Sequence, residues 1–232
     1  MSDRHGIRRR EALTTLGGLG LTGVLGGAAA ALTGGASPAV AAGSCVLSPE
    51  VTEGPYWIDV SLTRRDIREG KAGLPLEIVF TVENAKTCEV LGGADVEIWH
   101  CDATGEYSGF DGAGHARSST RYLRGHQKSD ASGQARFVTV FPGWYSGRTP
   151  HVHLKVHAGG NVVHTGQVFF NETTTAAVYR KAPYRSHGQP DTRHAADNIY
   201  RQAGSAKAEL KLTRRTNGSA GYRGAITLGV VV

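Results

Sequence analysis

Residues 134–170 read QARFVTVFPGWYSGRTPHVHLKVHAGGNVVHTGQVFF. Three runs in this stretch, 134–141, 151–158 and 161–170, are rich in β-branched and apolar residues, and Pro, Gly and Asn lie between them. This pattern is typical of consecutive β-strands. Because side chains two positions apart on a strand point to the same face, His151 and His153 are predicted to project together.

Further strand-like runs lie on both sides of this stretch, at residues 75–84, 95–101, 208–214 and 224–232. Long helical periodicity is hard to find, and only residues 171–181 and 194–202 favour short helices. Several short strands at this spacing predict an all-β sandwich or barrel. We expect a β-sandwich core with an extended N-terminal segment over 45–59 and short helices in the loops.

The first 41 residues have the composition of an export signal. Arg8, Arg9 and Arg10 precede a weakly apolar run rich in Gly and Thr, and Ala39-Val40-Ala41 fits a small-x-small cleavage site. The pattern predicts a twin-arginine-type signal peptide over 1–41 and one domain over 42–232. A membrane anchor is the alternative, but the many glycines make this run much less apolar than a spanning helix. We therefore expect a secreted protein without a stable membrane anchor.

The 232-residue chain carries 26 Lys and Arg against 20 Asp and Glu, a formal net charge of +6. Removing the four arginines and two acids of the leader leaves a net charge of about +4. The basic residues are scattered and form no stripe interleaved with aromatics, which argues against nucleic-acid binding. The three cysteines, Cys45, Cys88 and Cys101, predict one disulfide after export, and the sequence leaves the pairing open.

Paired imidazoles on one strand face suit a metal ion, although such pairs also occur as polar residues on a solvated sheet. Tyr145 lies six positions before His151, and Tyr107 lies in a Gly-containing loop after the run 95–101. Tyrosine is an unusual zinc ligand, whereas a hard trivalent cation favours the deprotonated phenol. Two tyrosinates, two neutral imidazoles and a hydroxide would neutralise iron(III).

Several blocks of the sequence carry a resemblance to a known family: TEGPYW (52–57), GADVEIWHCDATGEYSGFD (93–111), PGWYSGRTPHVH (142–153) and TGQVFF (165–170). Through them the chain resembles the intradiol ring-cleavage dioxygenases, which include the catechol and protocatechuate 3,4-dioxygenases. More narrowly, it resembles a secreted, single-domain bacterial branch. The resemblance spans most of residues 45–170. It implies Fe(III) as cofactor and cleavage of a catechol-type substrate by O2 to a cis,cis-muconate-type product.

The resemblance also implies a ligand set. Tyr107 follows the Trp-His strand, Tyr145 lies in the Pro-Gly-Trp-Tyr turn, and His151 and His153 form the His-x-His pair. These four residues correspond to the family's two tyrosines and two histidines, which bind non-haem iron(III). Tyr145 is also expected to leave the metal and accept one proton from the catechol.

Three further residues match positions near the substrate in this family. Arg148 corresponds to the arginine that lies against the substrate ring, where it stabilises developing negative charge. Gln167, in TGQVFF, matches a glutamine near the substrate, and Tyr56, in TEGPYW, falls on the segment that borders the pocket. A surface ion pair for Arg148, second-sphere contacts for Gln167 and simple packing for Tyr56 are the alternatives.

One departure concerns the loop between the second tyrosine and the first histidine, which is shorter here than in the larger family members. It leaves the pocket shape and the particular catechol open, and the sequence does not determine the oligomeric state. Two rival interpretations are a non-enzymatic, transthyretin-like binding module and a secreted copper site on the His pair.

The remaining histidines carry no motif. We expect His100, next to Trp99, to be buried or in the second sphere of the site and not a ligand. We interpret the others as ordinary polar residues: His115, His126, His157, His164, His187 and His194.

Overall fold

The computed structural model describes residues 45–110, 118–216 and 220–232. The expected leader, 1–41, and His115 therefore lie outside the described residues. The strands are β1 (Pro75–Asn84), β2 (Asp95–Trp99), β3 (Arg124–Lys128), β4 (Gln134–Val140), β5 (His151–Ala158), β6 (Asn161–Phe169), β7 (Lys211–Arg214) and β8 (Tyr222–Val230). The helices are α1 (Glu172–Val178), α2 (Asn198–Gln202) and three 3₁₀ turns at Tyr184–Ser186, His194–Ala196 and Ser205–Ala208.

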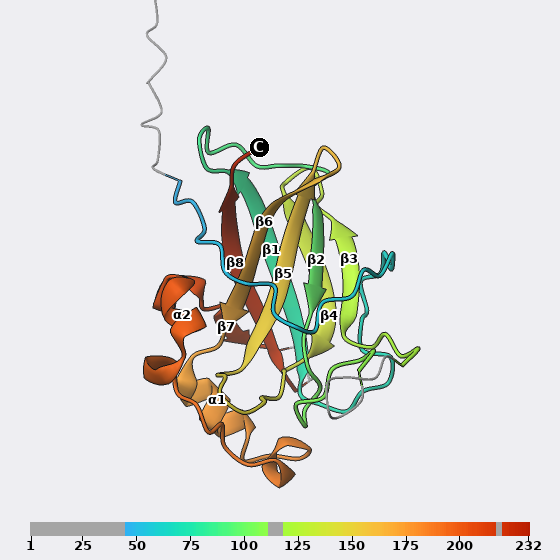
Figure 1. Ribbon diagram of the computed structural model, residues 1–232, viewed down its shortest axis with the longest axis vertical. Helices are drawn as coiled ribbons and strands as arrows, with labels where there is room; N and C mark the ends of the chain where they lie inside the picture. Colours follow the sequence, from blue (N-terminus) through green and yellow to red (C-terminus); the bar gives the residue numbers. More distant parts are fainter. Residues whose placement is uncertain (1–44, 111–117, 217–219) are drawn as a thin grey trace, which may run out of the picture. The chain divides into compact units, whose positions relative to one another are not determined.

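The strands form two four-stranded sheets with the orders β4-β1-β8-β7 and β3-β2-β5-β6 (Figure 1). The predicted β-sandwich is therefore confirmed. The pairing is antiparallel throughout, except that β1 and β8 lie parallel in the middle of their sheet. Short helices follow β6 in the chain, as expected. The side chains of Asn171 and Asp197 cap the N-termini of α1 and α2, which stabilises these short helices.

The hydrophobic core lies between the two sheets. On β5 the inward side chains Val152, Leu154 and Val156 are fully buried and belong to one cluster with residues of β1, β2 and β4. Residues at alternate positions, His151 and His153 among them, take the opposite face of the same strand. The core and the predicted metal ligands thus share one strand but not one face.

An extended N-terminal segment, residues 51–63, covers the outer face of the β3-β2-β5-β6 sheet (Figure 1). Successive residues of the segment contact successive strands of the sheet, from β6 to β3. The Thr52 carbonyl accepts from Gln167 of β6, and Glu53 pairs with Lys155 of β5. Trp57 then donates to Glu97 of β2 at 2.9 Å, and Thr63 bridges to His126 of β3. This covering explains why β5 is buried on both faces.

The disulfide joins Cys45 to Cys88, and Cys101 is free and buried. The bond ties the start of the described chain to the loop that follows β1, next to the bridge between Leu47 and Gly229 of β8. The single disulfide that the sequence predicts is therefore present, and the structure supplies the pairing that the sequence left open.

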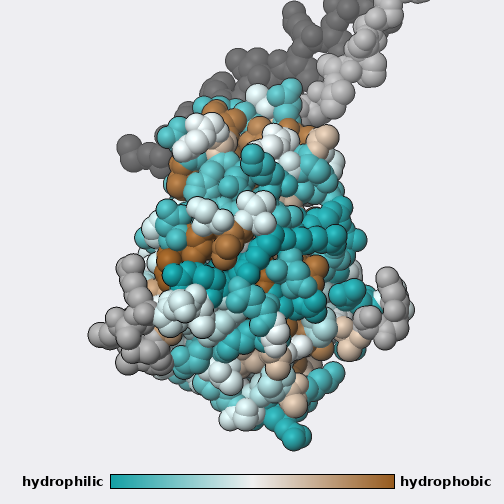
Figure 2. Space-filling model, turned by 90° about the vertical axis from the view of Figure 1, so that its right-hand side faces the viewer, coloured by the Kyte–Doolittle hydropathy of each residue, from teal (hydrophilic) through white to brown (hydrophobic). Residues whose placement is uncertain are grey.

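On the face drawn in Figure 2, hydrophobic residues form small areas surrounded by hydrophilic ones. Among the described residues, the exposed large hydrophobic side chains are valines and one leucine: Val46, Leu47, Val90, Val162, Val231 and Val232. None of the helices in the described ranges is long and apolar enough to cross a membrane.

Candidate metal centre

The four predicted ligands come from β5 and from two loops that lie at one end of the same sheet. His151 and His153 begin β5, Tyr145 lies in the β4–β5 loop, and Tyr107 lies in the β2–β3 loop. His153 stacks on Trp99 of β2, with ring centroids 5.0 Å apart and planes 8° apart. The strand pairing of Trp99 with His153 produces this stack, which fixes the imidazole plane.

The nitrogen atoms of the two histidines converge. Nε2 of His151 lies 3.0 Å from Nε2 of His153 and 3.3 Å from the hydroxyl of Tyr145. The Thr149 carbonyl accepts from Nδ1 of His151 at 2.7 Å, so Nε2 of that ring presents its lone pair to the site. Two nitrogens bound at right angles to one ion at about 2.1 Å lie about 3 Å apart. The spacing therefore fits two ligands of a single metal ion.

Tyr107 completes the group. Its side chain is 3% exposed, and its hydroxyl has no hydrogen-bond partner among the described residues. Its ring centroid lies 5.8 Å from that of Tyr145 and 6.1 Å from that of His153. A buried hydroxyl without a partner is costly, and a metal ion at this point would satisfy it. The donor set of two phenols and two imidazoles is one that fits ferric iron.

Burial sets the protonation of these groups. Burial lowers the pKa of His151 to about 3 and that of His153 well below its ordinary value. Both imidazoles are therefore neutral at pH 7, as metal ligands must be. Burial also raises the pKa of Tyr145 to about 12 and that of Tyr107 well above 10. The phenols are protonated unless a cation stabilises the phenolate, so metal binding and phenol ionisation are coupled.

Arg148 reaches the same place from the β4–β5 loop. Its guanidinium donates to Oε1 of Gln167 at 2.6 Å and lies 3.4 Å from the hydroxyl of Tyr145. Gln167 in turn donates to the Thr52 carbonyl of the covering segment. The surface ion pair considered for Arg148 is not what the structure contains, because its carboxylate partner, Asp197, is 1% exposed.

Asp197 is a residue that sequence reasoning missed. Its Oδ2 accepts from Nε of Arg148 at 2.9 Å and from the backbone of Thr149 at 3.0 Å, while its Oδ1 caps α2. Burial opposes its ionisation, but Arg148 and the backbone N–H groups outweigh burial, so its pKa is lowered. Its only sequence signal is a capping pattern before a short helix, which does not indicate a site 49 residues upstream.

Tyr56 stacks on Tyr107, with centroids 4.3 Å apart, and meets Tyr145 edge to face at 5.6 Å. The three tyrosines, with Phe110 and Trp144, line a depression of about 200 Å³ next to the ligand group. Tyr56 thus borders this depression, and its ring also packs against a predicted ligand.

His100 is not part of the ligand group. It is fully buried, donates through Nδ1 to the Cys101 carbonyl at 2.8 Å, and accepts through Nε2 from Thr139 at 2.7 Å. Both ring nitrogens are engaged, so the ring has no lone pair free for a metal. Burial lowers the pKa of His100 to about 4.

Comparison with known proteins identifies the family to which the chain belongs. No family model matches the sequence. Among curated proteins, a chlorocatechol 1,2-dioxygenase of Cupriavidus pinatubonensis is 30% identical over 147 residues, which are 53% of this chain and 54% of that protein. The chain thus spans about half the length of the curated relatives it matches.

Solved structures match more completely. An intradiol ring-cleavage dioxygenase from Tetranychus urticae is 34% identical, with a TM-score of 0.76 over 81% of this chain and 95% of that one. The dioxygenase domain of a carbohydrate-binding fusion from Streptomyces sp. SirexAA-E is 26% identical, with a TM-score of 0.60 over 81% and 99%. With its β-sandwich and its convergent tyrosines and histidines, the chain belongs to the intradiol ring-cleavage dioxygenase family.

Proposed function

We propose that the protein is an iron(III)-dependent dioxygenase that cleaves a catechol-type diol between its two hydroxyl-bearing carbons, with O2 as co-substrate. The convergence of Tyr145, His151 and His153 around one point, with the unpartnered hydroxyl of Tyr107 nearby, carries the proposal. The product would be a cis,cis-muconate-type dicarboxylate.

The four ligands would hold the ion in two different ways. Tyr107 is buried beneath Tyr56, and His153 is stacked on Trp99, so both are held in place by packing. Tyr145 is more exposed and lies on a loop beside the depression. Iron(III) bound here would act as a Lewis acid that binds both catechol oxygens and activates the ring towards O2.

In this proposal the side chain of Tyr145 accepts a proton from the catechol. Burial raises the pKa of this phenol to about 12, so its phenolate is a strong base once released from a cation. Its oxygen would accept one catechol proton, and the guanidinium of Arg148, 3.4 Å away, would orient the resulting hydroxyl. Arg148 would then face the reacting ring, where its fixed positive charge stabilises negative charge that develops during cleavage.

The visible spectrum of iron-reconstituted protein, before and after anaerobic addition of catechol, tests the proposal. We expect a tyrosinate-to-iron(III) charge-transfer band that shifts to longer wavelength with catechol. Tyr107→Phe and Tyr145→Phe should each weaken or move the band, while Tyr222→Phe, remote from the site on β8, should leave it unchanged. A colourless protein after reconstitution with iron would contradict the proposal and favour a metal-free binding module.

The substrate is then found by measuring oxygen uptake and product absorbance with simple catechols, hydroxyquinol and lignin-derived catechols. Among the curated relatives, one is named as acting on chlorocatechol and another on catechol. These names motivate the panel, in which halogenated catechols belong as well.

We also propose that the protein is exported through a twin-arginine-type signal in residues 1–41. The disulfide between Cys45 and Cys88 supports an oxidising destination. Lysine at positions 8, 9 and 10 in place of arginine should retain the precursor inside the cell. Fractionation and N-terminal sequencing test this, with a mature N-terminus near Ala42 as the expected result.

A further inference from the structure

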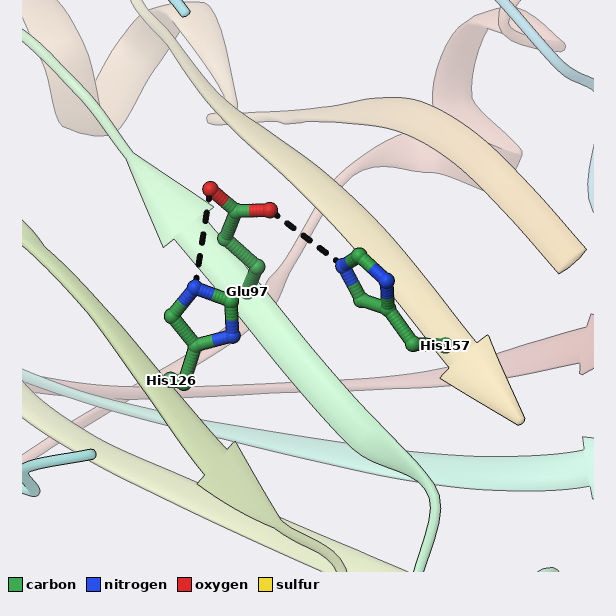
Figure 3. Close-up of side chains that lie close together, drawn as sticks. All are labelled: Glu97, His126 and His157. Carbon is green, nitrogen blue, oxygen red and sulfur yellow. Dashed lines mark hydrogen bonds and ion pairs between the residues drawn. The ribbon is translucent and has the colours of Figure 1, made fainter. Parts of the chain in front are cut away.

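A second group of metal-type side chains lies on the same sheet face, away from the tyrosines. Glu97 of β2, His126 of β3 and His157 of β5 point toward one another from three adjacent strands (Figure 3). Their ligand atoms all lie within 4.8 Å of one another. His157 is four positions beyond His153 on β5, which is about 13 Å along a strand, so the two groups are separate.

We propose that Glu97, His126 and His157 form a binding site for a divalent transition-metal ion of the zinc type. One carboxylate and two imidazoles make a ligand set that zinc adopts in proteins, with a fourth position left for water. The site does not depend on the proposed dioxygenase activity, because it shares no residue with the group of Tyr107, Tyr145, His151 and His153.

The first argument is the charge of Glu97. Its side chain is 3% exposed, and a buried carboxylate is costly without a charged partner. Trp57 donates one neutral hydrogen bond to it at 2.9 Å. Within the described ranges, its ion-pair partners are His126 and His157 alone, and both become cations only when protonated.

Nearby cations are engaged elsewhere. The ammonium of Lys155, the cross-strand neighbour of Glu97, pairs with Glu53 at 2.7 Å. The buried guanidinium of Arg124, on β3, donates to Ser108 at 2.7 Å. A metal ion at the cluster would supply the positive charge that Glu97 lacks.

The second argument is the orientation of His126. Its Nδ1 lies 3.2 Å from Oδ2 of Asp95, so this nitrogen is placed to donate to a carboxylate. Its Nε2 is buried and has no hydrogen bond in the described part of the chain, and it faces Oε1 of Glu97 at 3.7 Å. With Nδ1 protonated, a lone pair and a carboxylate oxygen confront each other, an arrangement that a cation between them stabilises. A carboxylate behind a ligand histidine is also the usual second-sphere partner in metal sites.

The third argument is geometry. Two ligands at about 2.0–2.1 Å from a tetrahedral ion lie about 3.4 Å apart. Nε2 of His157 is 3.3 Å from Oε2 of Glu97, and Nε2 of His126 is 3.7 Å from Oε1. Each histidine nitrogen is therefore near the required distance from a different carboxylate oxygen of Glu97, and the three ligand atoms lie within 4.8 Å of one another. His157 is the adjustable member, because it is 25% exposed and follows an irregularity in the β5–β6 register between Val156 and His157.

An ion at this site would join β3, β2 and β5, so its expected effect is on stability. The site has an entry path, since His157 is partly exposed and Glu97 closes the inner side. Once the metal concentration exceeds its Kd, the melting temperature should rise with the logarithm of that concentration.

Calorimetric titration of the full chain with Zn²⁺ at pH 7.5 tests the proposal, first on iron-loaded protein and then on a His151→Gln variant. The variant removes one of the four ligands of the tyrosine–histidine group, and the cluster variants described next determine whether a remaining Zn²⁺ equivalent binds at the second cluster. Spectra with Co²⁺ in place of Zn²⁺ should contain the intense visible bands of a four-coordinate ion.

Glu97→Gln and His157→Gln, each in the His151→Gln background, should weaken Zn²⁺ binding at least 10-fold. His194→Gln in the same background is the matched control, because His194 lies 3.4 Å from Glu209 in a histidine–carboxylate pair that has no third ligand among the described residues. Because His157 is only partly buried, its variant is the safer one to fold. No saturable Zn²⁺ binding, or binding that both cluster variants leave unchanged, would overturn the proposal.

Discussion

Arg148 shows how one residue joins several parts of the site. It contacts Asp197, Gln167 and the hydroxyl of Tyr145, which come from three separate elements. The buried carboxylate of Asp197 fixes the guanidinium in direction, and a fixed charge stabilises a transition state better than one that must reorganise. Asp197 is therefore a positioning residue whose effect on activity passes through Arg148.

Asp197→Asn should lower kcat about 10- to 100-fold with a smaller change in KM, because Arg148 loses its charged partner but not its place near the ring. Asparagine still caps α2 through its carbonyl oxygen, but its amide N–H groups then face Arg148 and the Thr149 N–H in place of a buried carboxylate oxygen, so the melting temperature should also fall. Asp197→Ala removes the cap of α2 as well, so it should lower the melting temperature further than Asp197→Asn while lowering kcat to a similar extent. Equal kcat values for Asp197→Asn and the wild type would refute the positioning role.

A second prediction at the residue scale concerns His100 and the pH dependence of stability. Burial lowers its pKa to about 4, against about 6.5 in an unfolded chain. Between these values the unfolded state binds more protons than the folded state, so stability rises with pH there. The free energy of unfolding should therefore fall as pH drops from 6.5 towards 4, by up to about 3 kcal/mol for this group. Denaturant titrations across this range should reveal the loss, and His100→Gln should flatten part of the slope.

The residues that the sequence predicted best are those in continuous motifs. His151 and His153 share a strand, and Tyr145 precedes them by six positions, so local spacing places them together. Asp197 and the partnership of Glu97, His126 and His157 depend on strand order, which no local pattern contains. For that reason the sequence alone predicts no more than ordinary polar residues at His126 and His157.

At the scale of elements, β3 is the strand that the sequence analysis missed. Its residues, RGHQK, lack apolar alternation because Gly125 lies between Arg124 and His126. Buried Arg124 donates hydrogen bonds to Ser108 and lies over the rings of Tyr107 and Phe110, and a buried charged residue of this kind gives no hydropathy signal for a strand. The other strands carry apolar residues on their inward faces, and the predicted runs overlap all of them. The run 208–214 is the least accurate, because it begins in the 3₁₀ turn Ser205–Ala208 and β7 covers Lys211–Arg214 alone.

The disulfide between Cys45 and Cys88 anchors the chain six residues before the extended segment 51–63. Cys45→Ser should destabilise the fold by roughly 4 kcal/mol at most, since the bond closes a loop of 43 residues. Because Tyr56 lies on the segment, KM for a catechol should also rise. Thermal unfolding and kinetics with and without reductant check both effects, and an unchanged KM would show that the segment holds without the bond.

At the scale of the whole molecule, the core and the site occupy opposite faces of β5. Leu154→Ala should cost about 2–5 kcal/mol, because Leu154 is fully buried between the sheets. The iron spectrum per folded molecule should stay the same, since His153 and Lys155 point the other way. Denaturant unfolding, with the spectrum recorded below the transition, tests whether stability and metal binding are separable.

The parallel pairing of β1 with β8 has a consequence for the order of folding. Each residue of β1 from Leu76 to Asn84 pairs with one that lies 146 positions later in the chain. During synthesis, β1 therefore cannot pair with β8 until nearly the whole domain has left the ribosome. Contacts so distant in sequence slow folding, and until they form β1 is open to association with other chains.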